Sequence, residues 1–120
     1  MERQIETEHL YLLDLIEVLL PHPAGLRRWV IMRSIRKSHE LAGRPISHKF
    51  EDRVERVFRN HCADSIIFKK QNIAPEKALF YWPQGKAAGL WAVYAEKAQT
   101  FLNAADTDFF LNSKPADKEF

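Results

Sequence analysis

Four residues with cationic or amide side chains recur at helical spacing in the middle of the chain and could bind a polyanion. They are Lys49, Arg53, Arg56 and Asn60. At about 100° per residue these positions gather on one side of a helix, with Asp52 beside them. Such groups bind phosphates and the acceptor atoms of guanine, so DNA binding is our working interpretation, which depends on the neighbouring elements as well as on this helix. The alternative is a solvated helix face, since Asp52–Arg56 and Glu55–Arg59 are both spaced for i,i+4 ion pairs.

These basic positions need a helix that buries its opposite side, and residues 47–62 have the required pattern. The apolar face is formed by Phe50, Val54, Val57, Phe58 and His61, which recur at helical spacing. Ser47 is expected to be the N-cap, because its hydroxyl can accept a hydrogen bond from an amide of the first turn.

Two further helices are expected before this one. Residues 6–20 carry a stripe of leucines and isoleucine and end at Pro21-His22-Pro23, which cannot continue a helix. Residues 26–38 form the second helix. Its expected buried side consists of Trp29, Val30, Ile31 and Ile35, and its exposed side carries Arg27, Arg28, Arg33, Arg36 and Lys37.

The second half of the chain contains the clearest strand pattern. Residues 78–82 and 90–94 are aromatic and aliphatic and flank a Gly- and Pro-containing loop, which predicts a hairpin with Lys86 at its tip. Residues 65–68 are expected to be a short strand or extended segment, and residues 69–77 an exposed loop. From Glu96 the chain could form a helix or simply end the hairpin, with a turn near Asp106 and a frayed terminus.

The composition and the charge distribution limit the class of protein. With 120 residues, 46 % of them hydrophobic and 28 % charged, the chain is expected to form an ordinary globular domain. Residues 26–59 carry ten Lys and Arg against four acids, whereas residues 1–25 carry one against five. This asymmetry favours a polyanionic partner, although basic surfaces are common.

Other kinds of site have weaker support. The single cysteine excludes an internal disulfide and a zinc site built from several cysteines. The five histidines show no metal-ligand spacing, so we expect no cofactor and no enzyme activity. We also expect no membrane span and a cytoplasmic location. Trp29, Tyr81, Trp82 and Trp91 are expected in the core, although clustered aromatic rings can also hold a modified or extruded base.

The order helix, helix, basic helix and aromatic hairpin resembles the winged helix-turn-helix family over residues 6–95. More narrowly, Asp64-Ser65 and Gly89-Leu90-Trp91-Ala92 resemble small winged-helix modules of bacterial restriction and DNA-modification systems. The resemblance implies an α+β fold with a three-helix core, a C-terminal hairpin wing and a short helical tail. Residues 1–95 would be the domain and 96–120 an extension. One departure is the linker of residues 39–46, which is long for a tight turn and could hold an inserted strand.

The resemblance also implies roles for individual residues on double-stranded DNA. The third helix would enter the major groove and the wing would touch the backbone or the minor groove. Groove contacts would come from His48, Lys49, Asp52, Arg53 and Arg56. Phosphate contacts would come from Arg27, Arg28, Lys37 and Ser47. Wing-tip contacts would come from Gln84 and Lys86.

The function expected from this resemblance is non-enzymatic DNA binding, as a transcriptional regulator or as a DNA-targeting module. The alternative is a protein-interaction or dimerisation module with the same fold, because fold does not fix function. The C-terminal tail could dock onto the domain or form a homodimer or partner interface. Its apolar residues are Phe101, Leu102, Phe109, Phe110 and Leu111.

Overall fold

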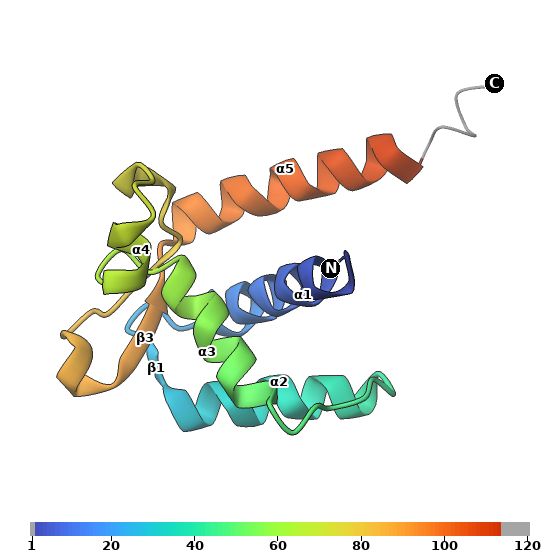
Figure 1. The fold of residues 1–120 in the computed structure, drawn as a ribbon, viewed down its shortest axis with the longest axis horizontal. Helices are drawn as coiled ribbons and strands as arrows, with labels where there is room; N and C mark the ends of the chain where they lie inside the picture. The colour runs from blue at the N-terminus through green and yellow to red at the C-terminus, as the bar shows by residue number, and fades with distance from the viewer. Residues whose placement is uncertain (1, 114–120) are drawn as a thin grey trace.

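Five α-helices and a small antiparallel sheet make up the described part of the chain in the computed structural model, which covers residues 2–113, with side chains over 8–104 (Figure 1). The α-helices are α1 Glu2–Leu19, α2 Arg28–Leu41, α3 Phe50–Asn60, α4 Ile66–Lys70 and α5 Ala95–Ser113. The strands are β1 Leu26–Arg27, β2 Phe80–Tyr81 and β3 Leu90–Val93, and two short 3-10 helices are η1 Pro75–Lys77 and η2 Lys86–Ala88. The structure therefore confirms the predicted α+β class.

The sheet has β3 at its centre, with β1 on one side and β2 on the other. Phe80 pairs with Val93 in the β2–β3 hairpin, which confirms the hairpin that the aromatic pattern predicts. Leu26 pairs with Trp91, so the start of the expected second helix is a strand instead. Gly25 allows this pairing: its φ is +94°, and a Cβ at this position would lie 2.9 Å from the Trp91 carbonyl oxygen.

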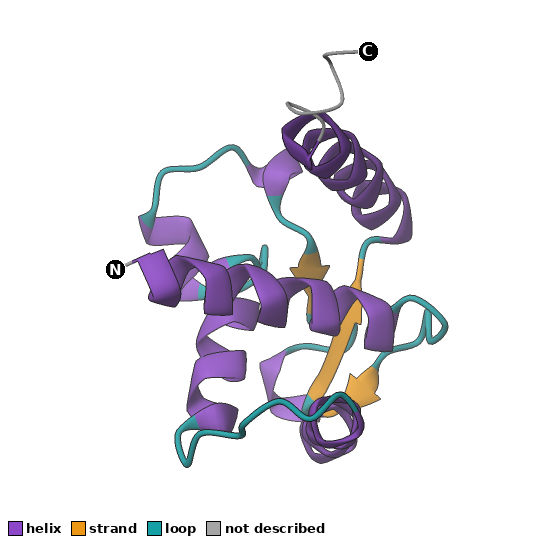
Figure 2. Cartoon of the chain, turned by 90° about the vertical axis from the view of Figure 1, so that its right-hand side faces the viewer, coloured by secondary structure: helices purple, strands orange, loops and turns teal. Residues whose placement is uncertain are grey.

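The core lies where α1, α2 and α3 meet one face of the sheet. Figure 2 shows α1 crossing in front of the sheet, with α2 below it and α5 above it. Leu15, Ile16 and Leu19 of α1 are fully buried, as are Ile31 and Ile35 of α2. The leucine and isoleucine stripe of the first helix therefore packs as its periodicity predicts, although the helix begins earlier than residue 6.

The buried side of α2 differs from the prediction. It consists of Ile31, Met32, Ile35 and His39, which recur at helical spacing. Trp29 is 59 % exposed, so the expectation that it lies in the core is wrong. The reason is its angle on the helix, since a residue two positions before Ile31 is turned well away from the side that faces α1.

The start of α3 also differs from the prediction. The helix begins at Phe50 with Lys49 as its N-cap residue, and no side chain caps it. The hydroxyl of Ser47 accepts a hydrogen bond from the Lys49 amide over 3.0 Å, which closes a turn before the helix. Ser47 is therefore not the N-cap. The strand that could have been inserted between the second and third helices is absent, since residues 42–49 contain no strand. The third strand of the sheet is β1, ahead of α2.

Residues 66–70 form a helix where a strand or extended segment is predicted. Ser65 determines this outcome, because its buried hydroxyl accepts hydrogen bonds from the amides of Ile67 and Phe68. Phe68 is buried, whereas Ile66 and Ile67 are exposed. The predicted loop at 69–77 begins inside this helix and ends in η1.

The C-terminal segment is one helix, α5, rather than a continuation of the hairpin. Ala98 is fully buried, and Phe101 and Leu102 pack partly buried against the core. The side chains of Phe109, Phe110 and Leu111 lie outside the described residues. Over the part of the chain that the structure describes, no helix has the length and apolarity needed to cross a membrane.

Candidate nucleic-acid interface

The side of α3 opposite its buried residues is a cationic, solvent-exposed surface. Asp52, Arg53 and Arg56 are exposed, as are His48 and Lys49 immediately before the helix. Figure 1 shows α3 crossing the molecule between α2 and α4. The structure thus brings together the five residues that the resemblance places at the DNA groove, with Asn60 half-buried at the end of the same helix.

The cations on this surface have no acidic partners among residues 8–104. No carboxylate lies within 4.0 Å of the charged nitrogens of Lys49, Arg53 or Arg56, so the expected Asp52–Arg56 ion pair does not form in this range. Arg53 lies on the flank towards α1, where its charge opposes the rise that burial causes in the pKa of Tyr11. These positive charges are therefore available to an anionic partner.

Glu55 joins α3 to α2 on the other flank of α3. Its Oε1 accepts a hydrogen bond from Arg28 Nε over 2.9 Å, and its Oε2 lies 2.8 Å from Arg59 Nη2. Arg28 also contacts Glu51 over 3.3 Å. The expected Glu55–Arg59 pair is confirmed, and Arg28, expected at a phosphate, holds α2 against α3.

These contacts lower the pKa of the Glu55 carboxylate. Burial acts to raise its pKa, but the hydrogen bonds and charges of Arg28 and Arg59 outweigh burial, and the net pKa lies below its ordinary value of 4.5. A carboxylate with a lowered folded-state pKa contributes stability above the pKa of the unfolded chain and loses it as the pH falls through the folded value.

Replacing Glu55 should therefore destabilise the protein in a pH-dependent way. At pH 7 we expect Glu55→Gln to lower the free energy of unfolding by about 1–2 kcal/mol. The difference from the wild type should shrink as the pH falls below about 4.5, the ordinary glutamate value, and vanish below the lowered folded pKa. Urea denaturation at several pH values measures it, with Glu51→Gln as the control because Glu51 has one long ion pair. A pH-independent difference would contradict this assignment.

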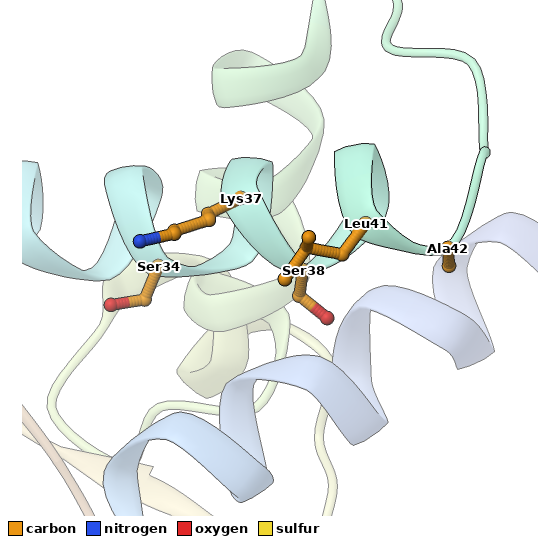
Figure 3. Close-up of a pocket in the computed structure, with 5 residues that line it drawn as sticks. All are labelled: Ser34, Lys37, Ser38, Leu41 and Ala42. Carbon is orange, nitrogen blue, oxygen red and sulfur yellow. The ribbon is translucent and has the colours of Figure 1, made fainter.

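The cations of α2 divide between two sides of the helix. Arg33 lies over the Trp29 ring at 5.3 Å, and Arg36 lies over the Phe50 ring of α3 at 5.2 Å. Lys37 instead lines an open hollow of about 560 Å³ together with Ser34, Ser38, Leu41 and Ala42 (Figure 3).

Arg28 and Arg36 thus contact α3, whereas Arg33 lies over Trp29 of its own helix. We predicted Arg33 and Arg36 to be exposed but did not assign them to DNA. The i,i+4 spacing of Trp29 and Arg33 is visible in the sequence, whereas the contact between Arg36 and Phe50 depends on the tertiary fold.

The remaining predicted contacts lie at one end of the sheet. Gln84 and Lys86 are exposed in the connection between β2 and β3, as the hairpin predicts. Arg27 is exposed on β1, and its Nη1 donates to the Ala88 carbonyl of the same connection over 3.4 Å. These three residues place further hydrogen-bonding and positive groups at the hairpin.

Contacts of Trp82 hold the hairpin against α3, among them the ring contact with Phe58 at 6.4 Å. The Arg59 guanidinium lies 5.8 Å from the centre of the Trp82 ring. The Trp82 amide donates a 2.9 Å hydrogen bond to Asp64, which follows α3. The position of the hairpin is thus fixed relative to the cationic helix.

The His61–Cys62 step does not provide a nucleophile. Cys62 is fully buried, and burial raises the pKa of its thiol to about 11, so the thiol is protonated at neutral pH. Burial also lowers the pKa of His61, against an opposing effect of Glu8. Among the described residues, no group of three or more His, Cys, Asp or Glu side chains is arranged to hold a metal ion.

Comparison with known proteins yields no relative: no family model, curated protein or solved structure matches this chain.

Proposed function

We propose that this protein binds double-stranded DNA without catalysing a reaction. The observation that carries the proposal is the exposed side of α3, where Lys49, Arg53 and Arg56 have no carboxylate partner among residues 8–104. Unpaired cations along one helix are the groups that neutralise DNA phosphates and release their counterions. Arginine can in addition bind the acceptor atoms of guanine in the major groove.

The order of the elements supports a winged-helix mode of binding. A helix, a short strand, two helices and a two-stranded hairpin follow one another, and the short strand pairs with the last strand of the hairpin. In such a domain α3 would lie in the major groove, and Gln84 and Lys86 at the hairpin tip would reach the neighbouring backbone. The helix α4 and the segment up to η1 are an insertion into that layout. A transcriptional regulator and a DNA-targeting module both fit this mode of binding.

A fluorescence-anisotropy titration of labelled duplex DNA at low and moderate salt tests the proposal. For the wild type we expect the affinity to fall steeply as salt increases. The double variant Arg53→Ala/Arg56→Ala should bind about tenfold or more weakly, and the slope of log affinity against log salt should become shallower by roughly two. Both side chains are exposed, so the variant should keep its fold, which circular dichroism verifies.

The matched control removes two positive charges elsewhere. Lys77 lies in η1 and Lys97 in the first turns of α5, where its ammonium lies 4.3 Å from the centre of the Tyr94 ring. Lys77→Ala/Lys97→Ala changes the net charge equally and should leave most of the affinity intact. Equal losses in the two double variants would argue for diffuse attraction, and no loss in the α3 variant would refute the role of α3.

A protein-interaction or dimerisation role is the second candidate, and α5 favours it. Figure 1 shows α5 extending from the body of the fold, and its residues Phe101 and Leu102 are only partly buried. The parts of Phe101 and Leu102 that remain exposed could bind a second copy of the chain, which would suit palindromic DNA. If the protein acts only in this second role and does not bind DNA, the anisotropy titration with duplex DNA should show no salt-dependent affinity.

A further inference from the structure

The exposed flank of α2 carries a tryptophan whose position the core does not explain. Trp29 is 59 % exposed, although an indole ring has more apolar area to bury than any other side chain. The guanidinium of Arg33, one turn further along, lies 5.3 Å from the ring centre. Arg33 has no carboxylate partner within residues 8–104, so the stacked pair presents a flat ring next to an unneutralised positive charge.

Trp29 and Arg33 lie on the same flank of α2 as Arg36, which contacts the start of α3. Arg36 is seven residues after Trp29, which places the two within about 20° of each other around the helix. The guanidinium of Arg36 lies over Phe50, the first residue of α3, so this flank of α2 lies beside the start of α3 at Arg36.

The acid of α2 on this flank, Glu40, is in the last turn of the helix, far from Trp29. The α3 acids near the start of α2, Glu51 and Glu55, are paired with Arg28.

Building on the DNA binding proposed above, we propose that Trp29 is a stacking platform for an unpaired base of a DNA strand bound along α2 and α3. Aromatic rings beside cations bind single-stranded nucleic acid in this way, because every base has a flat face and every nucleotide a phosphate. Arg33 holds the indole and contacts a neighbouring phosphate. Bases inside a duplex are already stacked, so the preferred ligand is duplex DNA with a single-stranded overhang.

Two labelled DNAs with the same duplex and the same number of phosphates test this. One has a short thymine overhang, and the other has an overhang of abasic sugars. We expect the wild type to bind the thymine overhang about tenfold more tightly than the abasic one. Trp29→Ala should abolish this preference, and Trp29→Phe should keep most of it.

Leu41→Ala is the matched control, because Leu41 is 81 % exposed on the same helix but on the side that lines the hollow of Figure 3. It should leave the preference unchanged. Equal wild-type affinity for the two overhangs, with salt-dependent duplex binding intact, would overturn the stacking platform and leave the proposed function standing. A Trp29→Ala loss that is equal for both overhangs would assign Trp29 to the backbone and also overturn it. Absence of any DNA binding by the wild type would refute both.

Discussion

His39→Ala is expected to lower the free energy of unfolding by about 3–5 kcal/mol. The His39 imidazole is 3 % exposed, and its Nε2 donates to Asp14 Oδ2 over 2.7 Å, joining α2 to α1. The ring also stacks on Tyr11 at 5.7 Å and meets the edge of Phe50 at 6.0 Å. The substitution removes these contacts and leaves the nearly buried Asp14 carboxylate without its partner. Urea denaturation at neutral pH measures the loss.

A double variant separates the unpaired carboxylate from the lost packing. Asp14→Leu/His39→Leu removes both polar groups, so no buried polar atom of the pair remains without a partner. We expect it to be more stable than His39→Ala, because replacing both members of a buried pair costs less than removing one. If His39→Ala costs less than about 1 kcal/mol, the pair does not hold α1 and α2 together.

Phe58→Ala should have a comparable effect, about 3–5 kcal/mol in the free energy of unfolding. Phe58 is fully buried beneath the sheet, and its ring stacks on Trp91 at 4.1 Å and on Phe80 at 5.1 Å. Removing the ring leaves a cavity between α3 and the two strands that form the hairpin. Urea denaturation measures the loss, and the near-ultraviolet circular dichroism of the tryptophans should weaken.

The control for Phe58 is an aromatic residue of similar size that is only partly buried. Phe101 packs against the core from α5 and contacts the His9 ring at 6.2 Å. Phe101→Ala should cost clearly less than Phe58→Ala, since its ring already contacts water on one side. Equal losses would mean that α5 is as essential to the core as the α3–sheet contact.

The elements with strong local patterns were predictable from the sequence. The hairpin was visible because aromatic residues on both sides of a Gly- and Pro-containing loop favour paired strands, and Phe80 does pair with Val93. The helix around Val54 and Val57 was visible from its apolar spacing. Helix α4 was missed because Ile66 and Ile67 suggest a strand, whereas the Ser65 cap decides the local structure.

The candidate site was only partly predictable, because contacts between residues far apart in the sequence decide which of its charges are paired and which are not. Lys49, Arg53 and Arg56 share an exposed side as their spacing predicts. The ion pair of Arg28 with Glu55 joins residues 27 positions apart, and no local pattern indicates it. Likewise β1 has two residues, too few for a strand pattern, and it becomes a strand through its pairing with β3.

The contacts of Trp82 with Arg59 and Asp64 have a consequence for affinity. They hold the hairpin and α3 in one arrangement in the unbound protein, so binding requires little additional ordering of the hairpin backbone. Such preorganisation reduces the entropic cost of complex formation and favours partners whose shape already fits. Removing the contact between Arg59 and Trp82 should therefore broaden the range of partners that the surface binds and lower its affinity for each of them.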